Sequence, residues 1–184
     1  TSFMPLTRDK APVGLICQSG IFFVGSAIFS GPIGKGIDIG NACDIGFYEA
    51  LEYLGDDPDI KIIAIHMEGL EQVREFVALT TRLTKEKPII VFKTGQSEAG
   101  AKAAASHSGA MAGHYRIYKA SLKQAGIHFL DEDGQMNDAV KTLLHQPPMK
   151  GNRVAVITVT GAGGIIASDA FDKYGLKMAS LSEK

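Results

Sequence analysis

The 184-residue sequence contains no tryptophan, only two cysteines and no marked excess of charge of either sign. With 19 basic and 20 acidic side chains and no runs of Lys or Arg, it gives no support to a nucleic-acid partner or a membrane-surface role. Cys17 and Cys43 lack metal-ligand spacing, so we expect free thiols in a reducing cytoplasm and no metal site. No apolar run reaches the roughly 18 residues of a membrane-spanning helix, and no signal peptide is visible.

What the sequence does contain is an alternation of apolar runs with helical patterns. The apolar runs predict strands at 13–17, 34–40, 60–68, 88–93 and 127–130. Helical patterns lie at 25–31, 44–57, 70–85, 115–126 and 133–146. Strands that are apolar on both faces and separated by helices are typical of a parallel sheet covered on both sides. We therefore expect an α/β fold, a doubly wound parallel sheet of the flavodoxin-like type.

The pattern is interrupted near residue 150 and then starts again. PPMKGNR (147–153) combines prolines, glycine and charge, which is typical of a linker. The following VAVITVTGAGG repeats the plan of VGLICQSG near the beginning: an apolar strand, a glycine turn and a helix. We expect a first domain over 1–146 and, over 154–184, the first βα unit of a second similar domain. Because the chain starts at Thr1, we interpret it as a piece of a longer protein.

Both copies of this plan place a glycine turn before a helix, and such a turn points backbone N–H groups at an anion above the sheet. The candidate residues are Ser19 and Gly20 in the first copy and Gly161, Gly163 and Gly164 in the second. The alternative is a pair of tight turns that serve only to connect strand and helix, with Ser19 as an N-cap.

The stretch KTGQSEAGAKAAASHSGAMAG (93–113) follows an apolar run and contains one histidine, His107. Ser106, Ser108 and Gly109 leave its imidazole sterically open, and we interpret the Ala/Gly tract as a loop with a flexible or closely approached backbone. An open imidazole can attack phosphorus if a carboxylate holds its other nitrogen in the right tautomer. A solvent-exposed or structurally bonded histidine is the alternative.

Glu68 is the candidate carboxylate, because it ends the predicted strand 60–68 at the edge where ligand sites of open α/β sheets collect. Its alternative role is an N-cap or first-turn acid of the next helix. In a parallel sheet the strand ends share one edge, so we expect Glu68, Ser19 and the His107 loop on the same side of the domain.

Taken together, CQSG (17–20), EYL..DP to MEG (52–69) and K.G....GAKAA.SHSG (93–109) resemble the NDP-forming acyl-CoA synthetases, the superfamily of ADP-forming acetyl-CoA synthetase and succinyl-CoA synthetase. The resemblance implies interconversion of acyl-CoA, ADP and phosphate with carboxylic acid, CoA and ATP through a phosphohistidine. It assigns the phosphohistidine to His107, in its Ser-His-Ser-Gly context with Ser108 and Gly109, and its orienting carboxylate to Glu68.

In the same family two helix N-termini hold the phosphate. The resemblance places them at Ser19 and Gly20 and at the turn with Gly161, Gly163 and Gly164. The second turn departs from the family pattern, because VTGAGG has neither the Asn nor the Pro that many members carry there.

Family members also use a CoA-binding Rossmann domain and an ATP-grasp module, and neither is visible in this sequence. We therefore expect these domains or subunits as partners, in a homo- or hetero-oligomer. The complete enzyme would use CoA, ATP or ADP, phosphate and Mg through these partners. We expect this chain alone to bind no cofactor and to have no activity of its own. The first alternative is a non-catalytic anion-binding module of the same fold. The second is a flavodoxin-like receiver or FMN domain, which the lack of an acidic cluster after the first strand and of flavin-stacking aromatics in the loops disfavours.

Overall fold

The computed structural model describes residues 11–29, 33–108 and 115–180, with the side chains of 26–29 and 107–108 left out. The chain divides into two compact units, Thr1–Gln146 and Pro147–Lys184, and each is described here by itself. None of the helices in the described ranges is long and apolar enough to cross a bilayer.

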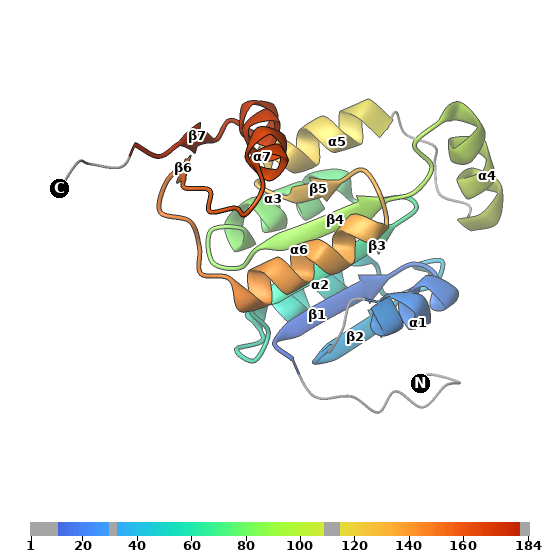
Figure 1. Cartoon of the computed structure of the whole chain (residues 1–184). Helices are drawn as coiled ribbons and strands as arrows, with labels where there is room; N and C mark the ends of the chain where they lie inside the picture. Colours follow the sequence, from blue (N-terminus) through green and yellow to red (C-terminus); the bar gives the residue numbers. More distant parts are fainter. Residues whose placement is uncertain (1–10, 30–32, 109–114, 181–184) are drawn as a thin grey trace. The chain divides into compact units, whose positions relative to one another are not determined.

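The first unit is built on a five-stranded parallel sheet with the strand order β2-β1-β3-β4-β5 (Figure 1). The strands are β1 (Val13–Cys17), β2 (Lys35–Asp38), β3 (Ile62–Met67), β4 (Ile89–Lys93) and β5 (His128–Leu130). Every residue of β1, β3 and β4 is buried, whereas the edge strand β2 alternates between partly buried and exposed positions. This strand order is that of a flavodoxin-like doubly wound fold, which confirms the prediction from the apolar runs.

Helices cover both faces of this sheet. They are α1 (Gly20–Phe29), α2 (Phe47–Asp56), α3 (Val73–Leu83), α5 (Tyr115–Gln124) and α6 (Gly134–His145). The helix α4 (Glu98–Ser108) has no buried residue among its described side chains and lies beside the sheet, at the right of Figure 1. Leu51, Phe76 and Leu122, from α2, α3 and α5, share one core layer. Met136 and Val140 of α6 pack with Phe22 of α1 in the other layer, so α1 and α6 cover the opposite face (Figure 1). The helix α1 begins at Gly20, earlier than the predicted start at residue 25.

The prediction of a loop around His107 is wrong for the backbone, because His107 lies in the last turn of the helix α4. Alanine is the strongest helix former, and the Ala-rich tract uses that propensity. Ser97 caps the start of the helix, since its Oγ accepts a hydrogen bond from the Gly100 N–H at 3.1 Å. Gly95, with a φ of 74°, makes the turn between β4 and the helix.

The second unit contains β6 (Arg153–Val154), α7 (Gly161–Tyr174) and β7 (Lys177–Met178), with β6 and β7 paired in parallel. The apolar run predicted a longer strand than the two residues of β6. Residues 155–158 are not in a strand, and Ile157 and Val159 are 100% and 102% exposed. The pattern is apolar enough for a buried strand, but beyond Val154 no neighbouring strand within the described part of this unit pairs with it.

Candidate functional site

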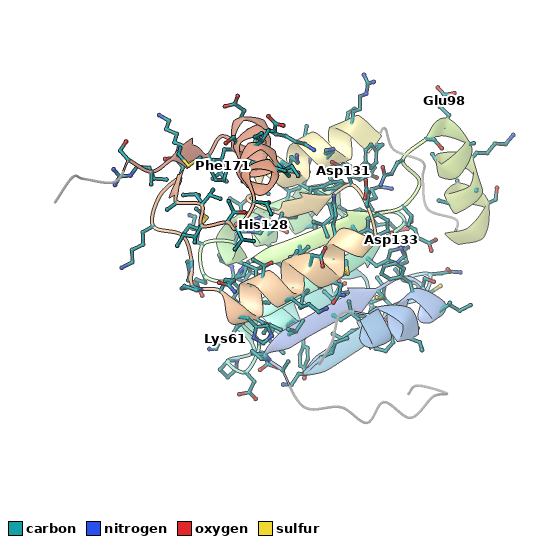
Figure 2. All side chains as sticks on the ribbon, viewed as in Figure 1. Lys61, Glu98, His128, Asp131, Asp133 and Phe171 are labelled. Atoms are coloured by element: carbon teal, nitrogen blue, oxygen red, sulfur yellow. The ribbon has the colours of Figure 1, made fainter. Side chains whose placement is uncertain are left out.

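The carboxyl ends of β1 and β3 lie side by side at the point where the strand order reverses, which is where open α/β sheets bind their ligands. Figure 2 shows Asp133, which follows β5, near this edge and Lys61, which precedes β3, at the opposite end of the sheet. The two strand ends are joined by the buried Gln18, whose Oε1 accepts hydrogen bonds from the N–H groups of Glu68 at 2.9 Å and Gly69 at 3.1 Å. Gln18 therefore fixes the backbone position of Glu68.

Ser19 and Gly20 lie at the start of α1. Ser19 Oγ accepts a hydrogen bond from the Phe22 N–H at 3.4 Å, so the N-cap role considered above is present in the structure. A helix start also leaves N–H groups without intrahelical partners, which is the chemistry that binds small anions. A Cβ atom added to Gly20 would lie 3.1 Å from Asp38 Oδ2, so a carboxylate stands beside this helix start.

Glu68 follows β3 at the same edge, and both Glu68 and Ser19 line one cleft of about 670 Å³. This confirms that the two residues share an edge. The alternative role of Glu68 is wrong, because the next helix, α3, has Gln72 at its N-cap and Glu75 as the acid of its first turn. Glu68 is therefore not placed to cap a helix.

Lys93, at the end of β4, is a buried cation next to Glu68. Its Nζ donates hydrogen bonds to the backbone oxygens of Glu68 at 2.7 Å and of Thr94 at 3.0 Å. Burial lowers the pKa of Lys93, and the charge of Glu68 acts in the opposite direction. The sequence analysis missed Gln18 and Lys93; the only available signal was a polar residue at the end of an otherwise apolar strand.

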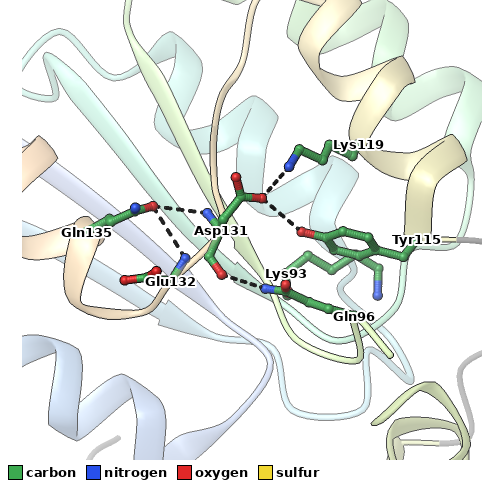
Figure 3. Close-up of polar contacts among 7 residues, drawn as sticks. All are labelled: Lys93, Gln96, Tyr115, Lys119, Asp131, Glu132 and Gln135. Atoms are coloured by element: carbon green, nitrogen blue, oxygen red, sulfur yellow. Dashed lines mark hydrogen bonds and ion pairs between the residues drawn. The ribbon is translucent and has the colours of Figure 1, made fainter. Parts of the chain in front are cut away.

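A polar network holds the segments that flank α4 (Figure 3). Gln96, just before α4, donates from Nε2 to the Asp131 backbone oxygen at 2.8 Å. The Asp131 carboxylate accepts from the Tyr115 hydroxyl at 3.3 Å and pairs with Lys119, which lowers the pKa of Asp131. Gln135 of α6 accepts from the Asp131 N–H at 3.0 Å. Asp131 thus ties the base of α4 to α5 and α6.

His107 and Ser108 belong to α4, but the structure describes only their backbone. Gly109 lies outside the described residues. The helix follows β4 from the edge that holds Ser19 and Glu68. The pairing of Glu68 with the imidazole of His107 therefore stays a prediction.

The second glycine turn opens α7 in the second unit. Thr160 is its N-cap, with Oγ1 accepting from the Gly163 N–H at 3.1 Å, and Gly161 and Gly164 belong to the same first turn. Because each unit is described by itself, the convergence of this turn with Ser19 and Gly20 also stays a prediction.

Apart from Ser19 and Glu68, the cleft at the carboxyl edge is lined by residues of α1, β3, α6 and the segments next to them. They are Ile21, Phe22, Gly25, His66, Thr94, Asp133, Gly134, Met136 and Asn137. Within the described ranges, no group of three or more His, Cys, Asp or Glu side chains is arranged to hold a metal ion. The cleft is therefore an apolar groove with a few polar groups, as in sites for small organic molecules.

The chain is similar to known proteins in sequence and in structure. Residues 10–143 match the family described as the succinyl-CoA ligase-like flavodoxin domain. The chain is 40% identical to the alpha subunit of ADP-forming acetate–CoA ligase II of Pyrococcus furiosus, over 95% of this chain and 39% of the relative. It is 38% identical to the alpha subunit of ligase I of the same organism, over 96% of this chain and 39% of the relative.

A solved structure of dinucleotide-forming acetyl-coenzyme A synthetase 1 from Ca. Korarchaeum cryptofilum, in complex with phosphate and ADP, matches with a TM-score of 0.87 and 31% identity. The match covers 94% of this chain and 39% of that one, so the chain spans about two fifths of the length of these relatives. The chain is homologous to the alpha subunits of ADP-forming acetate–CoA ligases and belongs to the family of succinyl-CoA ligase-like flavodoxin domains.

Proposed function

We propose that this chain is the histidine-bearing domain of an ADP-forming acyl-CoA synthetase. In the complete enzyme, acyl-CoA, ADP and phosphate are interconverted with carboxylic acid, CoA and ATP, and His107 carries the phosphoryl group between acyl phosphate and nucleotide. The observation that carries the proposal is the cleft that Ser19 and Glu68 share at the carboxyl edge of the sheet, from which α4 leads to His107.

The described residues fit a phosphoryl group at this edge. A phosphoryl group carries about −1.5 to −2 charges near pH 7, and each helix N-terminus contributes roughly 0.3 to 2 kcal/mol toward such a charge. Ser19 and Gly20 supply one helix start; Gly161, Gly163 and Gly164 supply the second in this proposal. The negative charge of Asp38 beside Gly20 weakens the binding of an anion at this helix start. Weaker binding suits a phosphoryl group that is transferred to another acceptor.

Glu68 has the orienting role in this proposal. Its carboxylate accepts a hydrogen bond from one nitrogen of the His107 imidazole, which leaves the other nitrogen free to attack phosphorus. The buried ammonium of Lys93 lies beside the Glu68 backbone and offsets part of the carboxylate charge. Ser108 and Gly109 leave room around the phosphorylated ring.

CoA-binding and ATP-grasp domains or subunits act as partners of this chain in our proposal. They supply the sites for CoA and for the Mg-bound nucleotide, so we expect the 184-residue chain alone to form no acyl-CoA. Formation of acyl-CoA by the isolated chain would contradict this assignment.

The test is acid-labile label from γ-labelled ATP and Mg²⁺ in the complete enzyme. His107→Ala should abolish both label and turnover, whereas the matched control His114→Ala should leave both largely intact. Glu68→Gln should fall between them, with a loss of about 10²-fold to 10⁴-fold, because the amide can still accept a hydrogen bond but carries no charge.

Normal labelling of His107→Ala would contradict the phosphohistidine role. Absence of acid-labile label from the unchanged enzyme would instead favour a non-catalytic anion-binding module of the same fold.

A further inference from the structure

The cleft at the carboxyl edge extends away from Ser19 and Glu68, between α1 and α6. Ile21 and Phe22 of α1 and Met136 of α6 give it apolar walls. Its volume of about 670 Å³ is larger than a phosphoryl group needs. The proposed phosphate position therefore leaves most of the cleft unexplained.

Among the residues that the structure describes, two buried polar atoms in this cleft have no hydrogen-bond partner: Nδ1 of His66 and Oδ1 of Asn137. His66 belongs to β3 and is only 2% exposed, and its ring stacks on Phe22 with centroids 3.9 Å apart. Leaving a buried donor or acceptor unpaired costs about 1–3 kcal/mol. Such a pair of atoms in one cleft indicates that a bound molecule completes their hydrogen bonds.

The charges around these atoms select the kind of group that can bind. Burial, with a further contribution from Lys93, lowers the pKa of His66 to about 4, so its imidazole is neutral near pH 7. The amide of Asn137 is also neutral, and the charged lining residues Glu68 and Asp133 are both acidic. A second carboxylate on the substrate would find no cation in this lining.

A hydroxyl group matches these requirements. It provides one donor and two acceptor lone pairs, so it can donate to the Asn137 amide oxygen and accept from the N–H of a neutral imidazole. The apolar walls suit a short hydrocarbon chain that leads to it.

We propose that the cleft between α1 and α6 holds the organic part of the carboxylic acid substrate, and that His66 and Asn137 bind a hydroxyl group on that acid. The inference rests on the proposed function. The carboxyl end lies toward the start of α1 and the hydroxyl end toward His66 and Asn137, so the substrate class is that of short hydroxylated carboxylic acids.

The experiment compares 4-hydroxybutyrate with pentanoate, in which a methyl group replaces the hydroxyl. Dissociation constants are measured on the 184-residue chain by calorimetry, and the carbon-bound imidazole protons of His66 are followed by NMR. We expect pentanoate to bind at least about tenfold more weakly, because it leaves both polar atoms unpaired. Only 4-hydroxybutyrate should shift the His66 ring signals strongly.

His66→Phe and Asn137→Leu should each bring the ratio of the two affinities close to one, while pentanoate still binds. His145→Gln, on an exposed histidine at the end of α6, is the matched control and should keep the wild-type ratio. Circular dichroism establishes that each variant is folded. Because Asn137 is only partly buried on a helix, its variant tests the proposal even if His66→Phe does not fold.

Equal affinities in the unchanged chain would overturn this inference, as would a crystal structure with 4-hydroxybutyrate in which only water contacts His66 and Asn137. Neither result touches the labelling of His107. Conversely, suppose that the complete enzyme shows no acid-labile label while the chain still prefers 4-hydroxybutyrate to pentanoate. That result would contradict the proposed function and leave the hydroxyl-binding cleft in place.

Discussion

The two units use one local plan, a strand followed by a glycine turn and a helix, with very different results. In the first unit VGLIC forms β1, in which every residue is buried between β2 and β3. In the second unit the matching apolar run forms a strand only at its start, in β6 (Arg153–Val154), and Ile157 and Val159 are fully exposed. Both turns nevertheless start a helix with a hydroxyl side chain that accepts from the first turn.

The turn and the start of the helix therefore depend on residues close in the sequence, whereas the strand depends on neighbouring strands and helices. A cap needs only residues within three positions of one another. A strand needs partners for its N–H and C=O groups and cover for its side chains, and these come from distant parts of the chain.

The largest contrast concerns apolar side chains of the two units. Ile16→Ala, in β1, should lower the free energy of unfolding by about 2–5 kcal/mol because Ile16 is completely buried. Ile157→Ala, in the second unit, should change it by less than about 0.5 kcal/mol, because Ile157 is fully exposed. Urea unfolding followed by far-UV circular dichroism gives both values. A large loss for Ile157→Ala would mean that the exposed run of the second unit is covered in solution.

The second contrast is in how the free energy of unfolding depends on pH, because the second unit contains no histidine. Burial, together with the charge of Lys93, lowers the pKa of His66 from 6.5 to about 4. Between pH 6.5 and 4 the unfolded chain therefore binds more protons than the folded chain. The contribution of His66 to the free energy of unfolding is complete above about pH 6.5 and is lost as the pH falls toward 4. The expected loss is about 3 kcal/mol in the first unit.

Hydrogen exchange of the β3 amides between pH 6.5 and 4.5, set against that of α7, measures the effect. His66→Phe should remove the pH dependence of β3, and the exposed control His145→Gln should keep it. Equal pH dependence in both units would contradict the assignment to His66.

The third contrast compares the two helix caps. Thr160→Ala should destabilise α7 by about 1 kcal/mol, because the Oγ1 of Thr160 accepts from the Gly163 N–H at 3.1 Å. Ser19→Ala should cost α1 about 0.5 kcal/mol, since its bond to the Phe22 N–H is longer, at 3.4 Å. Amide exchange rates in the first turns of the two helices report both losses, and the reverse ranking would contradict the geometry.

The smallest effect concerns the glycines that begin the helices. A Cβ atom at Gly161 meets nothing within 4 Å, so Gly161→Ala should stabilise α7 by about 0.5 kcal/mol. At Gly20 the Cβ atom would lie 3.1 Å from Asp38 Oδ2, so Gly20→Ala should give about zero. Melting temperatures of the two variants check this. A larger gain at Gly20 would mean that Asp38 moves away freely.

The candidate site was only partly predictable. Ser19 and Glu68 could be placed on one edge because each follows an apolar strand and parallel strands end together. Gln18 and Lys93 also lie at the ends of apolar strands, but that position alone does not mark them as site residues. His66 and Asn137 gave no such signal. His66 and Asn137 are 71 positions apart in the sequence. Their common property, a buried polar atom with no partner in the described part of the chain, exists only after β3 and α6 pack together.

The tract around His107 shows the opposite failure. Its glycines suggest a loop, but alanine favours a helix and Ser97 provides a cap. Local helix propensity outweighs the glycines at this position.

The sequence by itself determined the layered parallel sheet, because runs that are apolar on both faces can be satisfied only between two helix layers. It also indicated the glycine turns that precede α1 and α7, because caps and glycine turns act over a few residues, although the helical pattern placed the start of α1 five residues too late. Only the tertiary structure decided how far each apolar run continues as a strand, that Gln18 joins β1 to β3, and that His66 and Asn137 face one cleft. Those features depend on contacts between distant segments, which no local pattern encodes.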